Sequence, residues 1–504
     1  MQTNILEYLE QTAPRLPQKI AYSTGEEGMT FSALYQASRC IGSALHKLGV
    51  YREPIAILMD KHPNEVAAFF GTVYAGCYYV PLDAAMPVAR IKTILESVGT
   101  RYMIVDDKCM KIAQKPELEG VQILSYHELV NSAEDTEALD EIRKTAIDTD
   151  PIYIVFTSGS TGVPKGVVAC HRSVIDYVES LCEVMEFSEE TVFANQTPLY
   201  FDAPLKELMP VIKYGATAYF VPKKCFMFPM MLCDYLNRYR INTVCWVVSA
   251  LTSISELGAL QANPPRYLKT IAFGSEVFPK KQYEMWREAF PDAKFVNLYG
   301  PTEATGMSCY WNADRILDAN EPIPIGRPFR NTALLLIGED GKEARRGEQG
   351  EIFLRGTCVT LGYFNNPEKT AESFVQNPLH SHYPETVYRT GDIGYINERG
   401  ELVFVCRKDA QIKHQGHRIE LGEIETGAMN VQGVGRACCI YDAEKKRIAL
   451  FYTGNAEKNE VLRQLQACLP RYMLPAVLTK LERMPQTPNG KMDRKALAQM
   501  LDQV

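Results

Sequence analysis

A glycine-rich loop that carries a lysine is the segment of this sequence best suited to chemistry. Residues 157–166 read T-S-G-S-T-G-V-P-K-G and follow the apolar run 152–156. The glycines let the backbone approach a ligand closely, and the hydroxyl groups add hydrogen-bond donors. Backbone N–H groups together with the Lys165 ammonium would suit a polyphosphate. The string departs from the Walker pattern, because Gly166 stands where that pattern has Ser or Thr. A flexible turn of small residues is the alternative interpretation.

Two carboxylates and a second lysine stand in short glycine-containing strings further along the chain. Glu303 ends the string Y-G-P-T-E, Asp392 ends Y-R-T-G-D, and Lys491 follows Asn489-Gly490. Taken singly, these residues read as a surface glutamate, a turn aspartate and a solvated lysine. Any one such five-residue string is weak evidence, but the set taken together with the glycine-rich loop is specific.

In this combination the sequence resembles the adenylate-forming superfamily, which comprises acyl- and aryl-CoA synthetases, luciferases and the adenylation domains of nonribosomal peptide synthetases. The resemblance covers essentially all 504 residues, because the family's motifs occur in the expected order. Those motifs lie at residues 75–83, 157–166, 299–303, 388–392, 411–425 and 489–495. The resemblance implies a large N-terminal α/β domain with sheets flanked by helices, followed by a small mobile C-terminal α+β domain.

The resemblance also implies ATP and Mg²⁺ as cofactors and assigns most motif residues to the nucleotide. Glu303 would hold Mg²⁺, and Asp392 would accept both ribose hydroxyls, since a carboxylate can take two such bonds. Lys491 would bridge the substrate carboxylate and the α-phosphate during adenylation. The implied catalytic residues are Lys491, Thr302, Glu303 and Lys165. The implied nucleotide-binding residues are Thr157, Ser158, Gly159, Ser160, Thr161, Gly162, Lys165, Gly274, Ser275, Glu276, Asn297, Tyr299, Gly300, Thr302, Asp392 and Arg407.

Asp202 is the residue that distinguishes the class of acid. The string F-D-A at 201–203 matches the F-D-x-S motif of amino-acid adenylating relatives, with Pro204 in place of Ser. In those relatives the carboxylate pairs with the α-ammonium of the substrate, and a buried carboxylate without a partner would be costly. A helix N-cap is the alternative role. The implied substrate-binding residues are Asp202, Ala203, Lys206, Cys245, Ala272, Gly274, Leu298, Gly306 and Met307.

Lys206 is unusual in such a pocket and leaves two interpretations open. It either pairs with a carboxylate in the side chain of the substrate or turns toward a neighbour such as Glu207. The segment Glu276-Val277-Phe278-Pro279 resembles the E-V-L-P of stand-alone D-alanyl carrier-protein ligases, so D-alanine is a further candidate substrate.

A second step, in which a thiol takes the acyl group, follows from the same resemblance. Asp409 would be the hinge about which the small domain rotates, although the string Cys406-Arg407-Lys408-Asp409 lacks the glycine of the usual G-R-x-D. No carrier segment of the G-G-x-S type occurs, so the expected acceptor is the phosphopantetheine of a separate carrier protein acting in trans. The rival functions are an acyl- or aryl-CoA synthetase, against which Asp202 argues, and a catalytically silent scaffolding member of the family.

Hydrophobic periodicity predicts the elements that must position these residues. In residues 1–150, helical patterns such as 31–48 alternate with β-branched runs such as 55–59, which favours parallel strands in βα units. Beyond Val405 a smaller α+β pattern begins. We therefore predict an N-terminal domain over residues 1–408 and a C-terminal domain over 409–504.

Composition argues against several other classes of protein. Lys and Arg total 54 and Asp and Glu total 61, for a net charge of −7 without a basic block, so nucleic acid is not an expected partner. The longest apolar stretch, 66–80, is shorter than the ~20 residues that span a bilayer, and the first residues do not read as a secretory signal. The 14 cysteines form no C-x-x-C pair, which indicates reduced thiols and no structural metal site. We expect a cytoplasmic protein without a membrane partner.

Overall fold

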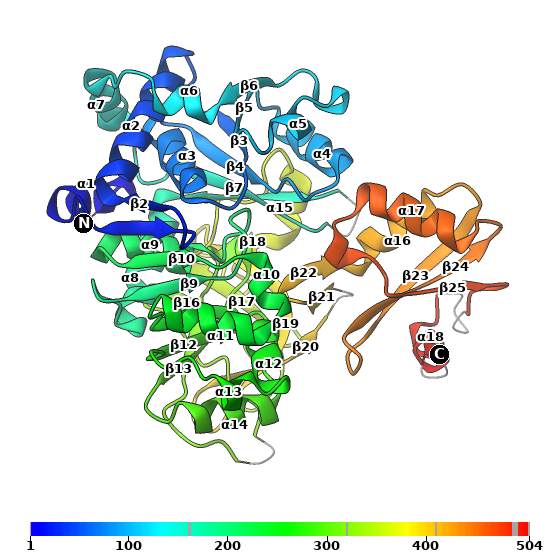
Figure 1. Cartoon of the computed structure of the whole chain (residues 1–504). Helices are drawn as coiled ribbons and strands as arrows, with labels where there is room; N and C mark the ends of the chain where they lie inside the picture. Colours follow the sequence, from blue (N-terminus) through cyan, green and yellow to red (C-terminus); the bar gives the residue numbers. More distant parts are fainter. Residues whose placement is uncertain (1, 160–162, 319–320, 409–410, 486–491, 502–504) are drawn as a thin grey trace.

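The computed structural model describes residues 2–159, 163–318, 321–408, 411–485 and 492–501 (Figure 1). Within these residues two large sheets and a smaller third sheet build the bulk of the molecule. The elements that follow the third sheet lie to one side of it in Figure 1. Among the described helices, none is both long enough and apolar enough to cross a membrane.

A six-stranded sheet carries the glycine-rich loop. Its order is β6-β5-β3-β4-β7-β8, and only β7 and β8 pair antiparallel. Thr157 at the end of β7 therefore pairs with Lys165, the first residue of β8. The strands are β3 (Pro54–Leu58), β4 (Tyr78–Leu82), β5 (Tyr102–Val105), β6 (Gln122–Ser125), β7 (Pro151–Thr157) and β8 (Lys165–Cys170). The helices that precede β7 are α1 (Leu6–Arg15), α2 (Phe31–Lys47), α3 (Pro63–Tyr74), α4 (Val88–Val98), α5 (Met110–Ala113), η1 (Pro116–Leu118), α6 (Tyr126–Val130) and α7 (Thr136–Thr145).

A nine-stranded sheet carries the residues expected to bind substrate. Its order is β15-β14-β13-β12-β11-β9-β10-β1-β2, parallel from β13 to β1 and antiparallel at both edges. The parallel strands β11, β12 and β13 end side by side, which is where open α/β sheets bind ligands. The strands are β1 (Ile20–Ser23), β2 (Gly28–Thr30), β9 (Val192–Asn195), β10 (Thr217–Phe220), β11 (Thr243–Val247), β12 (Thr270–Gly274), β13 (Lys294–Tyr299), β14 (Cys309–Asn312) and β15 (Arg327–Pro328). Its helices are α8 (His171–Met185), α9 (Leu205–Tyr214), α10 (Lys223–Met227), α11 (Pro229–Arg238), α12 (Val248–Glu256), α13 (Ala259–Ala262), α14 (Lys280–Ala289) and η2 (Thr302–Ala304).

One apolar cluster joins the two large sheets. It contains Ile55 and Val155 from the first sheet, Phe193 and Cys245 from the second, and buried residues of α2, α3, α8 and α9. Burial of such a cluster supplies the main favourable free energy for packing sheets and helices together. The strands β7, β11, β12 and β13 thus share one core.

The third sheet leads into the C-terminal elements. Its strands are β16 (Thr332–Ile337), β17 (Gly350–Gly356), β18 (Phe374–Gln376), β19 (Thr386–Ile396) and β20 (Leu402–Arg407), with α15 (Pro367–Ser373) before β18. The C-terminal elements are β21 (Gln411–His414), β22 (His417–Glu420), α16 (Leu421–Met429), β23 (Val434–Asp442), β24 (Arg447–Gly454), α17 (Lys458–Cys468), η3 (Arg471–Met473), β25 (Val477–Leu481) and α18 (Arg494–Leu501). These last elements have apolar clusters of their own. The boundary predicted at residues 408 and 409 stays a prediction.

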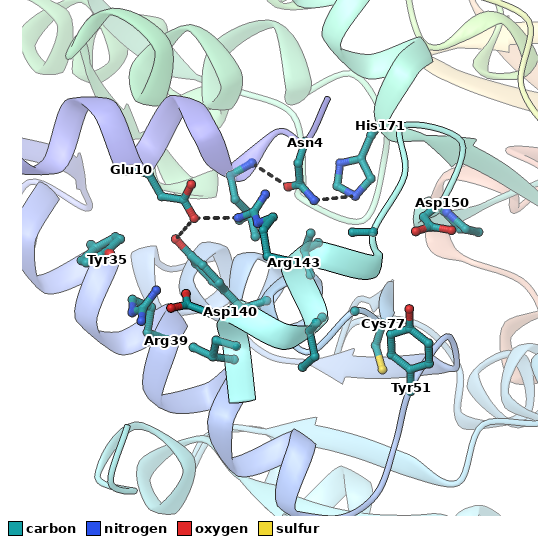
Figure 2. A pocket seen from close by; sticks show the side chains of 18 residues that line it. Asn4, Glu10, Tyr35, Arg39, Tyr51, Cys77, Asp140, Arg143, Asp150 and His171 are labelled. Atoms are coloured by element: carbon teal, nitrogen blue, oxygen red, sulfur yellow. Dashed lines mark hydrogen bonds and ion pairs between the residues drawn. The ribbon is translucent and has the colours of Figure 1, made fainter. Parts of the chain in front are cut away.

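His171 has a structural role at the start of α8. It is 3% exposed and lies at the end of a cavity of about 320 Å³ beside α1, next to Asn4 (Figure 2). Its Nδ1 accepts a hydrogen bond from the N–H of Ile5 at 3.2 Å. The imidazole therefore ties the segment before α1 to the start of α8.

Burial of His171 predicts an acid sensitivity of the fold. Burial, helped by the positive charge of Arg143, lowers the pKa of His171 from 6.5 to about 3. Between these values the unfolded chain binds a proton that the folded chain does not, so stability falls as the pH drops below 6.5. At pH 5 the loss is about 2 kcal/mol, because each pH unit corresponds to about 1.4 kcal/mol. Urea unfolding of the wild type and His171→Gln from pH 7 to pH 5 should show a flatter dependence in the variant; equal slopes would contradict the assignment.

Candidate functional site

A cavity lies where the two large sheets, the third sheet and the C-terminal elements meet. Many of the residues that the sequence predicted for nucleotide and substrate line this one cavity. They are Thr157, Ser158, Asp202, Ala203, Ser275, Gly300, Thr302, Gly306, Met307, Asp392 and Arg407. An adjoining cavity of about 290 Å³ is lined by Glu276, Asn297, Leu298 and Tyr299, and it shares Ser275 and Lys413 with the first. Residues that lie up to 250 positions apart in the sequence, from Thr157 to Arg407, are thus brought together.

The glycine-rich loop is covered by C-terminal elements. Ser158 Oγ donates a hydrogen bond to the carbonyl oxygen of Arg418 at 2.9 Å and accepts one from the N–H of Glu420 at 3.2 Å. The N–H of Gly159 donates to Glu423 Oε2 at 3.3 Å. Thr157 Oγ1 is buried and has no hydrogen-bond partner among the described residues, so it is available to a ligand. Three further predicted members of the loop lie outside the described residues: Ser160, Thr161 and Gly162.

Glu303 is the charged centre of the site. Its side chain is fully buried in η2, where Oε1 accepts a hydrogen bond from Tyr363 Oη at 2.7 Å and Oε2 pairs with Arg418 Nη1 at 2.7 Å. The Lys165 ammonium lies 5.2 Å from the centre of the Tyr363 ring. The turn before η2 requires glycine at Gly300, since a Cβ there would lie 2.5 Å from a backbone oxygen.

The surrounding charges keep Glu303 ionised. Burial alone would raise its pKa, but the positive charges of Arg418 and Lys165 and the Tyr363 hydroxyl lower the pKa to about 2. Burial, reinforced by the charge of Arg418, lowers the pKa of Lys165. In the described part of the chain no three His, Cys, Asp or Glu side chains converge as a metal-binding group. A single carboxylate can hold Mg²⁺ in proteins when phosphate and water supply the other ligands.

Asp392 joins the third sheet to the nine-stranded sheet. It is 3% exposed, and its Oδ1 accepts a hydrogen bond from Arg407 Nη1 at 2.8 Å, across the β19–β20 register. Its Oδ2 accepts a hydrogen bond from Tyr299 Oη at 2.5 Å. The Lys413 ammonium lies 5.6 Å from the centre of the Tyr299 ring. The predicted ribose and adenine residues are therefore adjacent, and Lys413 of β21 sits against them.

The residues of the predicted substrate pocket come from adjacent strands of the nine-stranded sheet and from the segment that contains Asp202. On the nine-stranded sheet Cys245 pairs in register with Ala272, and Gly274 with Leu298, so these residues form neighbouring positions on adjacent strands. Asp202 lines the cavity next to Gly306; its Oδ2 lies 3.7 Å from the place that a Cβ on Gly306 would occupy. Burial raises the pKa of Asp202, against the opposing effects of the Thr302 hydroxyl and the Lys206 charge.

Sequence reasoning missed several residues that shape the site. Tyr363 stands in an apolar string and gives no sign of its bond to Glu303. Arg418 belongs to a recognised motif, but its partner was not predicted. Glu276, predicted to bind nucleotide, accepts hydrogen bonds from the N–H groups of Ser249 at 2.8 Å and Gly416 at 2.9 Å, so it holds the β21–β22 turn. Two predicted residues lie outside the described ones: Asp409 and Lys491.

Comparison with known proteins gives matches over nearly the whole chain. Residues 9–364 match the AMP-binding enzyme family. The chain is 31% identical over 497 residues to a plipastatin synthase of Bacillus subtilis (strain 168), in a match that covers 97% of this chain and 13% of that protein. It is 30% identical over 499 residues to the L-proline–(L-prolyl-carrier protein) ligase of Streptomyces coelicolor. That match covers 94% of this chain and 92% of the ligase. The chain thus spans a small fraction of the plipastatin synthase and most of the ligase.

Solved structures share the fold. An NRPS protein containing adenylation and PCP domains, holo-PA1221, superposes with a TM-score of 0.84 at 22% identity, covering 99% of this chain and 84% of that one. The o-succinylbenzoate CoA synthetase of Bacillus subtilis superposes with a TM-score of 0.83 at 22% identity, covering 99% and 98%. These likenesses confirm the predicted α/β class with a large N-terminal and a small C-terminal domain.

Proposed function

The chain belongs to the AMP-binding enzyme family, and we propose that it activates an amino acid with ATP and passes the acyl group to a carrier-protein thiol. One observation carries this proposal. Asp202, Thr302 and Asp392 line a single cavity, and the buried Glu303 carboxylate follows Thr302 directly. An anchor for an ammonium group beside groups suited to a nucleotide supports an amino acid, rather than a fatty or aryl acid, as the substrate.

The first half-reaction rests on positioning and charge neutralisation rather than on a protein nucleophile. A carboxylate oxygen of the amino acid attacks the α-phosphorus of ATP, and the bond to pyrophosphate breaks. Lys165, Thr302 and Lys491 are proposed to stabilise the charge on the phosphates. When bound, Mg²⁺ would neutralise the triphosphate, and the ionised Glu303 carboxylate would hold it. Asp392 is proposed to accept the ribose hydroxyls, with Tyr299 against the adenine.

The second half-reaction fits the arrangement of the C-terminal elements. Arg418 Nη1 lies 2.7 Å from Glu303 Oε2, so Arg418 and a bound Mg²⁺ would compete for the same carboxylate. We therefore assign this arrangement to the step in which a thiolate sulfur attacks the acyl carbonyl carbon and AMP leaves. Adenylation would require the elements from β21 onward to withdraw Arg418 from Glu303, by a rotation proposed at Asp409.

ATP–pyrophosphate exchange tests the proposed function. The whole chain is given Mg²⁺, ATP and labelled pyrophosphate with L- and D-amino acids, fatty acids or aryl acids. Exchange that depends on an amino acid is the expected result. Exchange that depends only on a fatty or aryl acid, followed by thioester formation with coenzyme A, would establish the rival CoA synthetase. Binding of ATP without exchange for any acid would establish a catalytically silent protein.

A phosphopantetheinylated carrier protein tests the acceptor. Transfer of a labelled amino acid to the carrier, and not to coenzyme A or to the apo carrier, is expected in the presence of ATP. Equal transfer to coenzyme A would contradict recognition of a carrier.

A further inference from the structure

A buried ion pair joins α4 to the C-terminal elements beside the glycine-rich loop. Arg90 lies in the first turn of α4, and its Nη1 lies 2.5 Å from Oε1 of Glu423 in α16. The two side chains are only 6% and 1% exposed. Arg90 has no other ion-pair partner among the described residues. Because a buried charge without a partner is costly, each of the two residues needs the other in this arrangement.

The carboxylate of Glu423 also occupies a donor of the glycine-rich loop. Its second oxygen, Oε2, accepts a hydrogen bond from the N–H of Gly159 at 3.3 Å. One guanidinium and one backbone N–H therefore converge on the two oxygens of a single anion. Such a donor pair suits two oxygens of a phosphate equally well, because both anions accept the same charge-assisted hydrogen bonds. Glu423 thus holds the two donors that a phosphate on this loop would use.

The two donors belong to one part of the molecule and the carboxylate to another. Ile91 of α4 packs in the same apolar cluster as Ile154 of β7, the strand that leads into the loop. Ile424 of α16 packs in a cluster of the C-terminal elements. A rotation of those elements, as proposed for the adenylation step, would therefore withdraw Glu423 and leave Arg90 next to the loop.

Withdrawal of Glu423 would leave Arg90 without its anion at the place where the loop is expected to bind a polyphosphate. The guanidinium would also lose the cover of α17, which contacts α4 in the present arrangement. The proposed reaction brings two such anions to the loop, first the triphosphate of ATP and then the released pyrophosphate. Arginine suits either one, since its planar group can bind phosphate oxygens through two parallel N–H bonds.

We propose that Arg90 is a further phosphate-binding residue of the first half-reaction. Glu423 takes the place of pyrophosphate on Arg90 and Gly159 when the C-terminal elements close. The proposal rests on the function proposed above, because it takes ATP and pyrophosphate as ligands of the loop. Bound pyrophosphate and the closed arrangement then exclude each other. Pyrophosphate must leave before the thiol reacts, so it cannot convert the aminoacyl-AMP back to ATP while the carrier is bound.

Equilibrium binding of magnesium pyrophosphate tests the role of Arg90 without turnover and without an acid substrate. Dissociation constants for magnesium pyrophosphate and for AMP are measured on the whole chain by titration calorimetry. Arg90→Gln should weaken pyrophosphate binding about 10–100-fold, the size expected for a lost hydrogen bond between charged groups, and change AMP binding less than about 3-fold. A residue that only fastened the two parts together would act in the opposite direction, because its loss favours the open arrangement that binds pyrophosphate. Unchanged or tighter pyrophosphate binding in Arg90→Gln would therefore overturn the proposal.

Glu423→Gln gives the reciprocal measurement. The substitution keeps the size of the side chain but removes the charge that competes with pyrophosphate, so pyrophosphate should bind about 3–10-fold more tightly. Added pyrophosphate should also inhibit transfer to the carrier at a lower concentration in this variant than in the wild type. Unchanged or weaker pyrophosphate binding would contradict the competition.

Arg39→Gln is the matched control. Arg39 is also a helical arginine with a largely buried side chain, and it pairs with Glu134 at 2.7 Å beside the cavity of Figure 2. This variant should bind pyrophosphate like the wild type. An equal loss in both arginine variants would assign the effect to the fold and overturn the role of Arg90.

The binding measurement also separates this proposal from the proposed function. Amino-acid-dependent exchange together with unaltered pyrophosphate binding in Arg90→Gln would overturn the role of Arg90 and keep the proposed function. Absence of exchange with every amino acid, together with weakened pyrophosphate binding in Arg90→Gln, would overturn the proposed function and keep the role of Arg90.

Discussion

Replacing Glu303 by Gln is expected to lower amino-acid-dependent pyrophosphate exchange by about 10²–10³-fold, the size of effect seen when one group that stabilises a charged transition state is removed. The substitution keeps the shape of the side chain and its bond from Tyr363, but removes the negative charge that would hold Mg²⁺. Exchange should recover only slightly with excess Mg²⁺. Exchange within about 3-fold of the wild type would contradict the assignment of Glu303 as the metal carboxylate.

Glu351→Gln is the control for Glu303→Gln, because it also removes a buried carboxylate from an ion pair. Glu351 pairs with Arg389 at 2.8 Å and with Lys408 at 3.0 Å, away from the cavity. Burial would raise the pKa of Glu351, but hydrogen bonds from Arg389 and Lys408 and the positive charges of these two groups lower it, and the pKa of Glu303 is likewise lowered against burial. Glu351→Gln should therefore cost comparable stability while sparing exchange. If both variants lost pyrophosphate exchange equally, the loss in Glu303→Gln would be due to reduced stability of the fold and not to a missing metal ligand.

Replacing Arg418 by Gln is expected to separate the two half-reactions. Arg418 closes the C-terminal elements over the loop through its bond to Glu303, and breaking a buried pair commonly costs 3–5 kcal/mol. Part of that free energy stabilises the closed arrangement, which the second half-reaction is proposed to use. Transfer to the carrier should therefore drop about 10–100-fold, an effect of about 1.4–2.7 kcal/mol. Pyrophosphate exchange should stay within about 3-fold of the wild type, because in the proposed adenylation step Arg418 no longer contacts Glu303. Single-turnover transfer from a preformed aminoacyl-AMP measures the first quantity directly.

Arg447 provides the matched control for Arg418. It pairs with Asp442 at 3.0 Å within the C-terminal elements, away from the cavity. Arg447→Gln should leave both half-reactions near the wild-type rates. An equal fall of exchange and transfer in Arg418→Gln would contradict the assignment of the arrangement to the second step, as would unchanged transfer.

Local pattern was enough to predict the elements that carry the site. The apolar run 152–156 forms β7 (Pro151–Thr157), the helical pattern 31–48 forms α2 (Phe31–Lys47), and the run 55–59 coincides with β3 within one residue. Periodicity and turn residues decide such segments because their signals lie within a few neighbours. The motif strings, read through a family resemblance, then identified which loops face the cavity.

Contacts between residues far apart in the sequence could not be predicted from local pattern. Glu303 and Arg418 are 115 positions apart, and Ser158 and Glu420 are 262 apart. Hydrophobic periodicity does not predict which of several basic residues contacts a given carboxylate. That contact depends on how the C-terminal elements pack against the N-terminal sheets. Predictions on Asp409 and Lys491 stay predictions.

The cover over the glycine-rich loop has a kinetic consequence. Ser158 and Gly159 are buried beneath β22 and α16 and hydrogen-bond to them. If AMP binds there as proposed, it would leave only when those elements move away, and motions of this size take microseconds to milliseconds. Turnover under saturating substrates would then track the viscosity of the medium, and added glycerol would slow the cycle without altering the equilibrium of either half-reaction.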